Sequence, residues 1–152
     1  MQLMTTLCYI ENDNNEYLML HRVKKENDMN KDKYLGVGGK FEENESPFDC
    51  IRREIKEETG LNAENLSYRG IVTFISDIYP CGYMHLFICD KYSGEIKKCD
   101  EGNLVWIKKE DIYNLPLWEG DKIFFKLLEE KRPFFSLKLT YKGDKLEKYI
   151  IE

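Results

Sequence analysis

The stretch "GVGGKFEENESPFDCIRREIKEETGL", Gly36–Leu61, carries the densest chemical pattern in the chain and decides its fold. Three glycines fall within its first four residues, and glycine lets the backbone approach a ligand closely. Further along, Glu54, Glu57 and Glu58 crowd into two turns of a predicted helix. Like charges four positions apart destabilise a helix by roughly 0.2–0.5 kcal/mol. The question is therefore what compensates the repulsion among three carboxylates so close together.

Helix signals bracket these carboxylates. Ser46 can cap the helix, Pro47 suits its first position, and Gly60 is a good C-terminal stop. The sequence therefore predicts a helix from Ser46 to about Thr59. On a wheel that advances about 100° per residue, the carboxylates form one stripe, and the apolar stripe comprises Phe48, Ile51 and Ile55. The remaining arc is predicted to be a mainly basic, solvated face, formed by Asp49, Arg52, Arg53 and Lys56.

The acidic stripe has two interpretations. Charge runs usually mark a solvated helix face, which would give these carboxylates no chemical role. Alternatively, a divalent cation converts their repulsion into attraction. Several hard oxygen ligands suit Mg²⁺ or Mn²⁺, and such ions commonly bridge carboxylates to phosphates.

Composition limits the classes of protein to which the chain can belong. Its 152 residues, 42% of them hydrophobic, favour a single globular domain, and a net charge of -5 argues against a general nucleic-acid polymer binder. A small phosphorylated ligand is still compatible with this charge. Five cysteines without a CxxC pair predict reduced thiols in a cytosolic protein and no zinc site. The short apolar N-terminus predicts neither a signal peptide nor a membrane span.

The remaining elements are mostly strands. A second helix is predicted after "LPLWEGD", through about Lys131, because Ile123, Phe124, Leu127 and Leu128 follow helical spacing. A short extended piece is expected over Tyr34–Gly39. The predicted strands are Leu3–Ile10, Glu16–Arg22, Leu66–Ser76, Met84–Tyr92, Asn103–Ile107, Phe134–Tyr141 and Lys145–Ile151. Many strands with two helices predict an α+β domain or a sandwich.

The order of residues in the opening stretch resembles the Nudix box without a break. The matching positions are Gly39, Glu45, Arg53, Glu54, Ile55, Glu57, Glu58, Gly60 and Leu61. The resemblance implies a Nudix fold, with a mixed β-sheet core packed between α-helices, as one domain over residues 1–152. It also implies metal-dependent hydrolysis of a nucleoside diphosphate linked to another group. Asn44 stands where the family often has glycine, and Asn tolerates left-handed backbone well.

The resemblance also implies roles for individual residues. The implied metal ligands are the carboxylates of Glu54, Glu57 and Glu58 and the carbonyl oxygen of Gly39, binding Mg²⁺, with Mn²⁺ as a substitute. Arg53 would orient the carboxylates by ion pairing, the alternative being a surface arginine. Gly38 and Glu45 would support the loop before the helix.

Two further residues are implied outside the box. Glu101, in the loop "CDEGNLVWI", resembles a glutamate that related enzymes use as a late metal ligand or base, although a plain turn glutamate is the alternative. The general base is thus either Glu57 or Glu101. Arg22, at the end of a predicted strand, would contact phosphates, and a solvated arginine is its alternative.

Nearly the whole chain resembles the MutT-type subfamily, which implies an oxidised purine nucleoside triphosphate such as 8-oxo-dGTP as substrate. Trp118 and Asp121 would line the base pocket, by indole stacking and hydrogen bonding; a packing anchor and a helix N-terminal residue are their alternatives. Leu35 and Gly120 depart from the subfamily pattern, so ADP-ribose or another nucleotide is the second hypothesis. A non-catalytic nucleotide sensor is the third. We expect a cytoplasmic protein, monomeric or homodimeric, that binds neither nucleic-acid polymers nor membranes.

Overall fold

A computed structural model describes residues 2–152; Met1, included in the predicted 1–152 domain, lies outside the described residues. One mixed sheet runs through the molecule in the order β3-β2-β1-β5-β4-β7-β8, and β6 pairs with β2. The pairs β1–β5 and β4–β7 are parallel, and the others are antiparallel. The elements are β1 (Leu3–Glu11), β2 (Glu16–His21), β3 (Tyr34–Leu35), α1 (Pro47–Thr59), β4 (Asn62–Ser76), β5 (Gly82–Ser93), β6 (Asn103–Lys108), the 3-10 helix η1 (Lys109–Asn114), α2 (Glu119–Glu129), β7 (Phe135–Lys142) and β8 (Lys145–Ile151).

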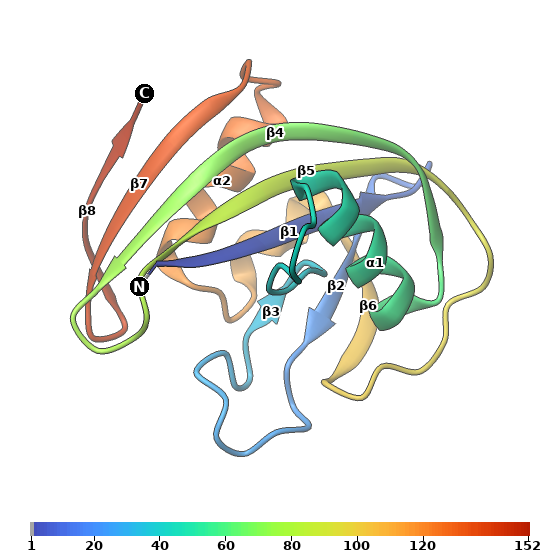
Figure 1. Ribbon diagram of the computed structural model, residues 1–152, viewed down its shortest axis with the longest axis horizontal. Coiled ribbons are helices and arrows are strands. Elements are labelled where there is room, and N and C mark those ends of the chain that lie inside the picture. The colour runs from blue at the N-terminus through green and yellow to red at the C-terminus, as the bar shows by residue number, and fades with distance from the viewer. Residues whose placement is uncertain (1) are drawn as a thin grey trace.

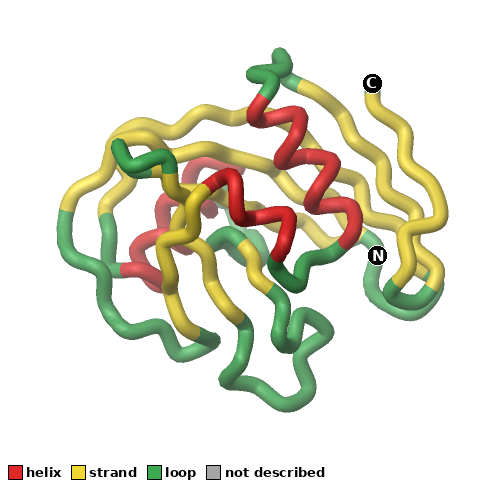
Figure 2. Tube along the Cα trace, turned by 180° about the vertical axis from the view of Figure 1, so that it is seen from behind, coloured by secondary structure: helices red, strands yellow, loops and turns green. Residues whose placement is uncertain are grey.

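The two α-helices cover opposite faces of this sheet (Figures 1 and 2). Successive side chains of a strand point to opposite faces, and β1 divides its residues accordingly. Cys8 and Ile10 pack in the cluster under α1, whereas Tyr9 packs in the cluster under α2. The predicted α+β class, with a mixed sheet between helices, is confirmed.

The helix that carries the glutamates begins and ends where its sequence signals predict. The Ser46 side chain accepts the N–H of Asp49 and the Asp49 side chain accepts the N–H of Ser46, which forms a reciprocal capping box. At the other end Gly60 adopts φ 82°, a left-handed conformation that suits glycine. Ile51 and Ile55 are fully buried against the sheet. The helix is therefore fixed in rotation, and its acidic stripe is held against the loop that contains Gly38 and Gly39.

Several predicted boundaries were wrong. β4 begins at Asn62 rather than Leu66, because its polar first residues still pair with β5 across bulges near Ala63 and Asn65. The piece Tyr34–Gly39 is a strand only over its first two residues, and beyond them Val37 makes an isolated bridge to Cys8 of β1. The η1 turn has no counterpart in the prediction, since so short an element shows no periodicity. No helix within residues 2–152 is long and apolar enough to cross a membrane.

Candidate functional site

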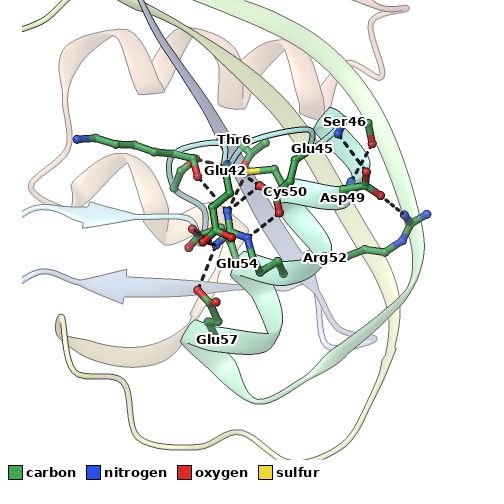
Figure 3. Close-up of polar contacts among 12 residues, drawn as sticks. Thr6, Glu42, Glu45, Ser46, Asp49, Cys50, Arg52, Glu54 and Glu57 are labelled. Carbon is green, nitrogen blue, oxygen red and sulfur yellow. Dashed lines mark hydrogen bonds and ion pairs between the residues drawn. The ribbon is translucent and has the colours of Figure 1, made fainter.

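Arg53 joins the loop before α1 to the carboxylates on the helix. Its guanidinium donates to both oxygens of Glu45, from Nε at 2.7 Å and from Nη2 at 2.9 Å. Its Nη1 donates to Glu54 at 2.8 Å and to Glu57 at 3.2 Å, and Nη2 also reaches the carbonyl oxygen of Lys40 at 3.0 Å. Figure 3 shows Glu45, Glu54 and Glu57 gathered on this side of the helix. The structure thus has the ion pairs implied for Arg53, whereas its placement on a solvated face was wrong, because its side chain is only 20% exposed.

Glu45 supports this arrangement from the loop. Besides the Arg53 fork, one of its oxygens accepts the N–H of Glu42 at 2.7 Å. The hydrogen bond from Arg53, then that from the Glu42 backbone, lowers the pKa of Glu45 to about 2. Bidentate arginine–carboxylate pairs fix geometry as well as charge. The loop and the helix are thus held together by a permanently charged pair.

Glu58 is the buried member of the acidic stripe, with an exposed fraction of 8%. One oxygen accepts the N–H of Gly38 at 2.8 Å. Burial, assisted by the neighbouring carboxyl of Glu101, raises the pKa of Glu58 to about 9 despite that hydrogen bond. The interpretation of the stripe as a solvated face fails at this residue, although the side chain of Glu57 is 58% exposed.

Glu101 reaches Glu58 from the loop between β5 and β6, 43 positions away in the chain. Its carboxylate also lies 3.7 Å from Arg22 and 3.3 Å from Lys25. Burial would raise the pKa of Glu101, but the hydrogen bond with Glu58 and the charges of Arg22 and Lys25 lower it below its ordinary value. Arg22 is itself held by Asp28 at 2.8 Å. The structure thus brings the predicted Glu101 and Arg22 together with α1.

Gly38 and Gly39 let the loop pass close to other groups. A Cβ on Gly39 would lie 2.6 Å from Oε1 of Glu54, and one on Gly38 would lie 2.0 Å from the carbonyl oxygen of Thr6. The carbonyl oxygen of Gly39 already accepts the N–H of Thr6 at 2.9 Å. This geometry lends no support to the predicted role of that oxygen as a metal ligand. Burial raises the pKa of Glu54, which is consistent with a carboxylate wedged against the loop.

These residues fit a divalent cation by the chemistry of their donor groups. The carboxyls of Glu58 and Glu101 meet in a partly enclosed place where their like charges perturb each other. Glu54 adds a third hard oxygen donor nearby, since its charge also raises the pKa of Glu58. Within the described part of the chain no three acidic, His or Cys side chains form a preassembled metal cage. A cation would therefore draw these carboxylates together and relieve their repulsion.

Trp118 and Asp121 lie at the start of α2, away from the carboxylates. Trp118 is buried, its Nε1 donates to Asn30 at 2.6 Å, and the ammonium of Lys33 lies 4.6 Å from its ring. Asp121 is buried too, and its Oδ2 has no hydrogen-bond partner. Burial raises the pKa of Asp121 to about 8, although Lys33 opposes the shift. Both alternatives for Trp118 thus gain support, because the ring is packed while an unsatisfied carboxyl lies near it.

Gly120 explains one departure from the subfamily pattern. Its N–H donates to the hydroxyl of Tyr141 at 2.7 Å. A Cβ here would lie 2.5 Å from Leu139 and 2.8 Å from that hydroxyl. A side chain at this position would therefore require Leu139 and Tyr141 to shift.

Sequence reasoning missed the residues of the loop between β2 and β3. Lys25 and Asp28 hold the acidic end of the site, whereas Asn30 and Lys33 hold Trp118. This polar stretch was predicted only as an exposed loop. Its charges gave no periodic signal, and its partners lie up to 88 positions away in the chain.

Comparison with known proteins gives a consistent result. The NUDIX domain family matches residues 1–128. The chain is 38% identical over 93 residues to the uncharacterized Nudix hydrolase YvcI of Bacillus subtilis, covering 58% of this chain and 59% of that protein. It is 30% identical over 111 residues to an oxidized purine nucleoside triphosphate hydrolase of Danio rerio, covering 68% of this chain and 67% of that one. A crystal structure of a MutT protein from Bacillus halodurans superposes with a TM-score of 0.87 at 27% identity, covering 99% and 97% of the two chains.

Proposed function

Because the chain belongs to the Nudix family, we propose that it is a divalent-metal-dependent pyrophosphohydrolase. The observation that carries this proposal is the meeting of Glu58, on α1, with Glu101, from a distant loop, beside Arg22. A purely structural helix has no need of a buried carboxyl next to a second one, because this contact costs stability. Phosphoryl transfer, in contrast, depends on positioning and charge stabilisation of this kind.

Each residue of the site has its own role in the proposed reaction. Glu54, Glu57, Glu58 and Glu101 would hold Mg²⁺ or Mn²⁺. When bound, such an ion activates water and neutralises phosphate charge. Arg53 holds Glu54 and Glu57 in register with the loop, and the Gly38 N–H orients Glu58. Arg22 provides positive charge beside Glu101, where a phosphate group would be bound. Glu101 or Glu57 accepts the proton of the attacking water.

For the substrate we propose an oxidised purine nucleoside triphosphate such as 8-oxo-dGTP, cleaved to the monophosphate and pyrophosphate. The similarity to the Danio rerio hydrolase and the near-complete overlap with the MutT structure support this choice. So does Asp121, whose buried Oδ2 has no hydrogen-bond partner and would gain one from a purine edge if the pocket opened. Asn30 and Lys33 would have to move for a base to stack on Trp118.

That same obstruction favours a second candidate. If the loop with Asn30 and Lys33 stays closed, Trp118 serves packing alone and cannot select an oxidised purine, which leaves a nucleoside diphosphate derivative such as ADP-ribose as the second candidate substrate. Leu35 packs against the core cluster under α2 and supplies no polar group for base recognition. A panel of nucleotides at equal concentration separates the two candidates.

The test is hydrolysis with Mg²⁺ of 8-oxo-dGTP, ADP-ribose, dGTP and a dinucleoside polyphosphate, each followed by chromatography of its nucleotide products. We expect 8-oxo-dGTP to have the highest kcat/KM. Glu101→Gln should lower kcat at least about 100-fold, whereas Glu147→Gln, an exposed control on β8, should leave it unchanged. Tight nucleotide binding without turnover under several divalent metals would instead indicate a sensor.

A further inference from the structure

A cavity of about 760 Å³ opens on the α2 face of the sheet, at the end opposite to Trp118. Its floor includes Tyr17 on β2, Ile88 on β5 and Leu128 on α2. A strand rises about 3.3 Å per residue and a helix about 1.5 Å. Tyr17 is therefore roughly 16 Å from Arg22 along β2, and Leu128 is roughly 15 Å from Trp118 along α2. The cavity is thus separate from both ends of the proposed active site.

Positive charge in this cavity is only partly compensated. Four basic and three acidic side chains line it, in a protein whose net charge is -5. Two of the acidic groups are engaged, Glu11 with Lys109 at 2.6 Å and Glu129 with the hydroxyl of Tyr113 at 3.3 Å. Three basic residues make no ion pair with any residue from 2 to 152, and these are Arg69, Lys131 and Arg132. The cavity therefore offers unpaired cations to an anionic ligand.

The end of α2 places two of these cations at the rim. Lys131 adopts φ 53°, its N–H donates to the carbonyl of Leu128, and the N–H of Arg132 donates to that of Leu127. These bonds wrap the chain tightly around the helix end. Basic residues there also complement the helix dipole, which would be a purely structural role. That role does not explain Arg69, a partly buried arginine on β4 without a carboxylate partner.

We propose that this cavity binds a small organic phosphate, with Arg69 and Arg132 holding the phosphate group and Ile88 and Leu128 contacting an apolar or aromatic body. Arginine suits this role because its planar fork donates two parallel hydrogen bonds to phosphate. The volume lies in the usual range for small-molecule pockets. Tyr17 closes the floor of the cavity, since its ring is buried between Phe125 and the ammonium group of Lys109.

Methyl NMR of the whole chain, without divalent metal, tests this site. Phenyl phosphate is titrated against ¹³C-labelled Ile88 and Leu128 methyl groups, with inorganic phosphate and phenol as partial probes. We expect saturable shifts of both methyl groups with phenyl phosphate and weaker binding of each partial probe. The double variant Arg69→Gln/Arg132→Gln should weaken binding by about tenfold or more. The matched control Arg52→Gln, on the exposed side of α1, should bind like the wild type.

Equal affinity in the double variant and the wild type would overturn the proposal, as would the absence of saturable shifts at Ile88 and Leu128. If the double variant loses its dispersed methyl spectrum, the milder Arg69→Lys/Arg132→Lys variant replaces it. That variant keeps the charge but removes the bidentate fork, so we expect weaker binding of phenyl phosphate. Unchanged affinity there would also count against the site.

Discussion

At the scale of single residues, the site contains a stable ion pair and a buried carboxyl that destabilises the folded protein. Arg53 and Glu45 form a bidentate pair in which both groups stay ionised, because each favours the charged form of the other. Glu58 experiences the opposite environment, being buried beside Glu101 with one backbone N–H as its partner. A rigid ion pair thus holds the loop beside α1, and a backbone N–H of that loop orients a carboxyl that is itself destabilising. Such an arrangement is typical of residues kept for function at the expense of stability.

Replacing Glu58 tests whether its buried carboxyl lowers the stability of the protein while being required for activity. Glu58→Gln keeps an acceptor for the Gly38 N–H and replaces a carboxyl that the folded protein must keep protonated beside Glu101, although the unfolded chain ionises it. We expect the free energy of unfolding without metal, at pH 8, to rise by about 0.5–2 kcal/mol, while pyrophosphate release is lost. Urea unfolding and the activity assay measure the two effects.

Glu57→Gln is the matched control, because this side chain is mostly exposed. Its activity should fall as well, but its stability should change by less than about 0.5 kcal/mol. A Glu58→Gln variant less stable than the wild type would show that the ionised carboxylate holds the loop, contrary to our interpretation.

Asp121 gives the protein a predictable dependence on pH. Burial raises its pKa to about 8, so the folded protein keeps a proton that the unfolded chain releases above about pH 4. This group therefore contributes full stability below pH 4, and the contribution is lost as the pH rises toward 8. Between pH 5 and pH 7 we expect stability to fall by about 1–3 kcal/mol more in the wild type than in Asp121→Asn. Parallel urea-unfolding curves for the two proteins across this range would contradict the assignment.

At the scale of elements, α1 was the most predictable part of the molecule. Its cap, its stop and its apolar stripe are all local features, so the sequence alone contains them. β4 was harder to predict, because its first residues are polar and become a strand only by pairing with β5. The loop between β2 and β3 could not be predicted at all from periodicity. Its residues are held by Glu101 and Trp118, which are distant in the chain.

At the end of α2 the backbone is strained, and a mutation can release this strain. Lys131 occupies the left-handed position after the helix, where a side chain costs roughly 1–2 kcal/mol and glycine does not. After allowing for the greater freedom of glycine in the unfolded chain, we expect Lys131→Gly to stabilise the protein by about 0.5–1 kcal/mol. Lys126→Gly, at an exposed position inside the same helix, should instead destabilise it by about 1 kcal/mol. Thermal unfolding of both variants measures these opposite signs, and a loss of stability in both would refute the strain argument.

At the scale of the whole molecule, the site exists because the sheet brings distant segments together. β2 pairs with β6 from Glu16 to His21, so the residues just after β2 and just before β6 meet at one edge. Arg22 and Glu101 occupy these two positions and face each other there. The box supplies Glu58 from the other side. Only the resemblance to the family pointed to Glu101, because no local pattern marks one glutamate in a polar loop.

This assembly predicts that metal binding stabilises the whole fold. A ligand that binds only the folded state adds about 2.7 kcal/mol of stability at a free concentration of 100 times its Kd. For a chain of this length, that corresponds to a rise in Tm of about 5–10 °C. Mg²⁺ should also slow amide exchange in the Gly94–Gly102 loop, since it ties Glu101 to α1.

Glu101→Gln should lose most of the Mg²⁺-induced rise in Tm, whereas Glu110→Gln, an exposed control on η1, should keep it. Both variants need melting curves at several Mg²⁺ concentrations, since the rise must saturate if it reports a site. A wild-type Tm that does not change with Mg²⁺ or Mn²⁺ would show that α1 binds neither ion. An equal rise in Glu101→Gln would leave α1 as the ion's binding element but would remove the distant loop from the site.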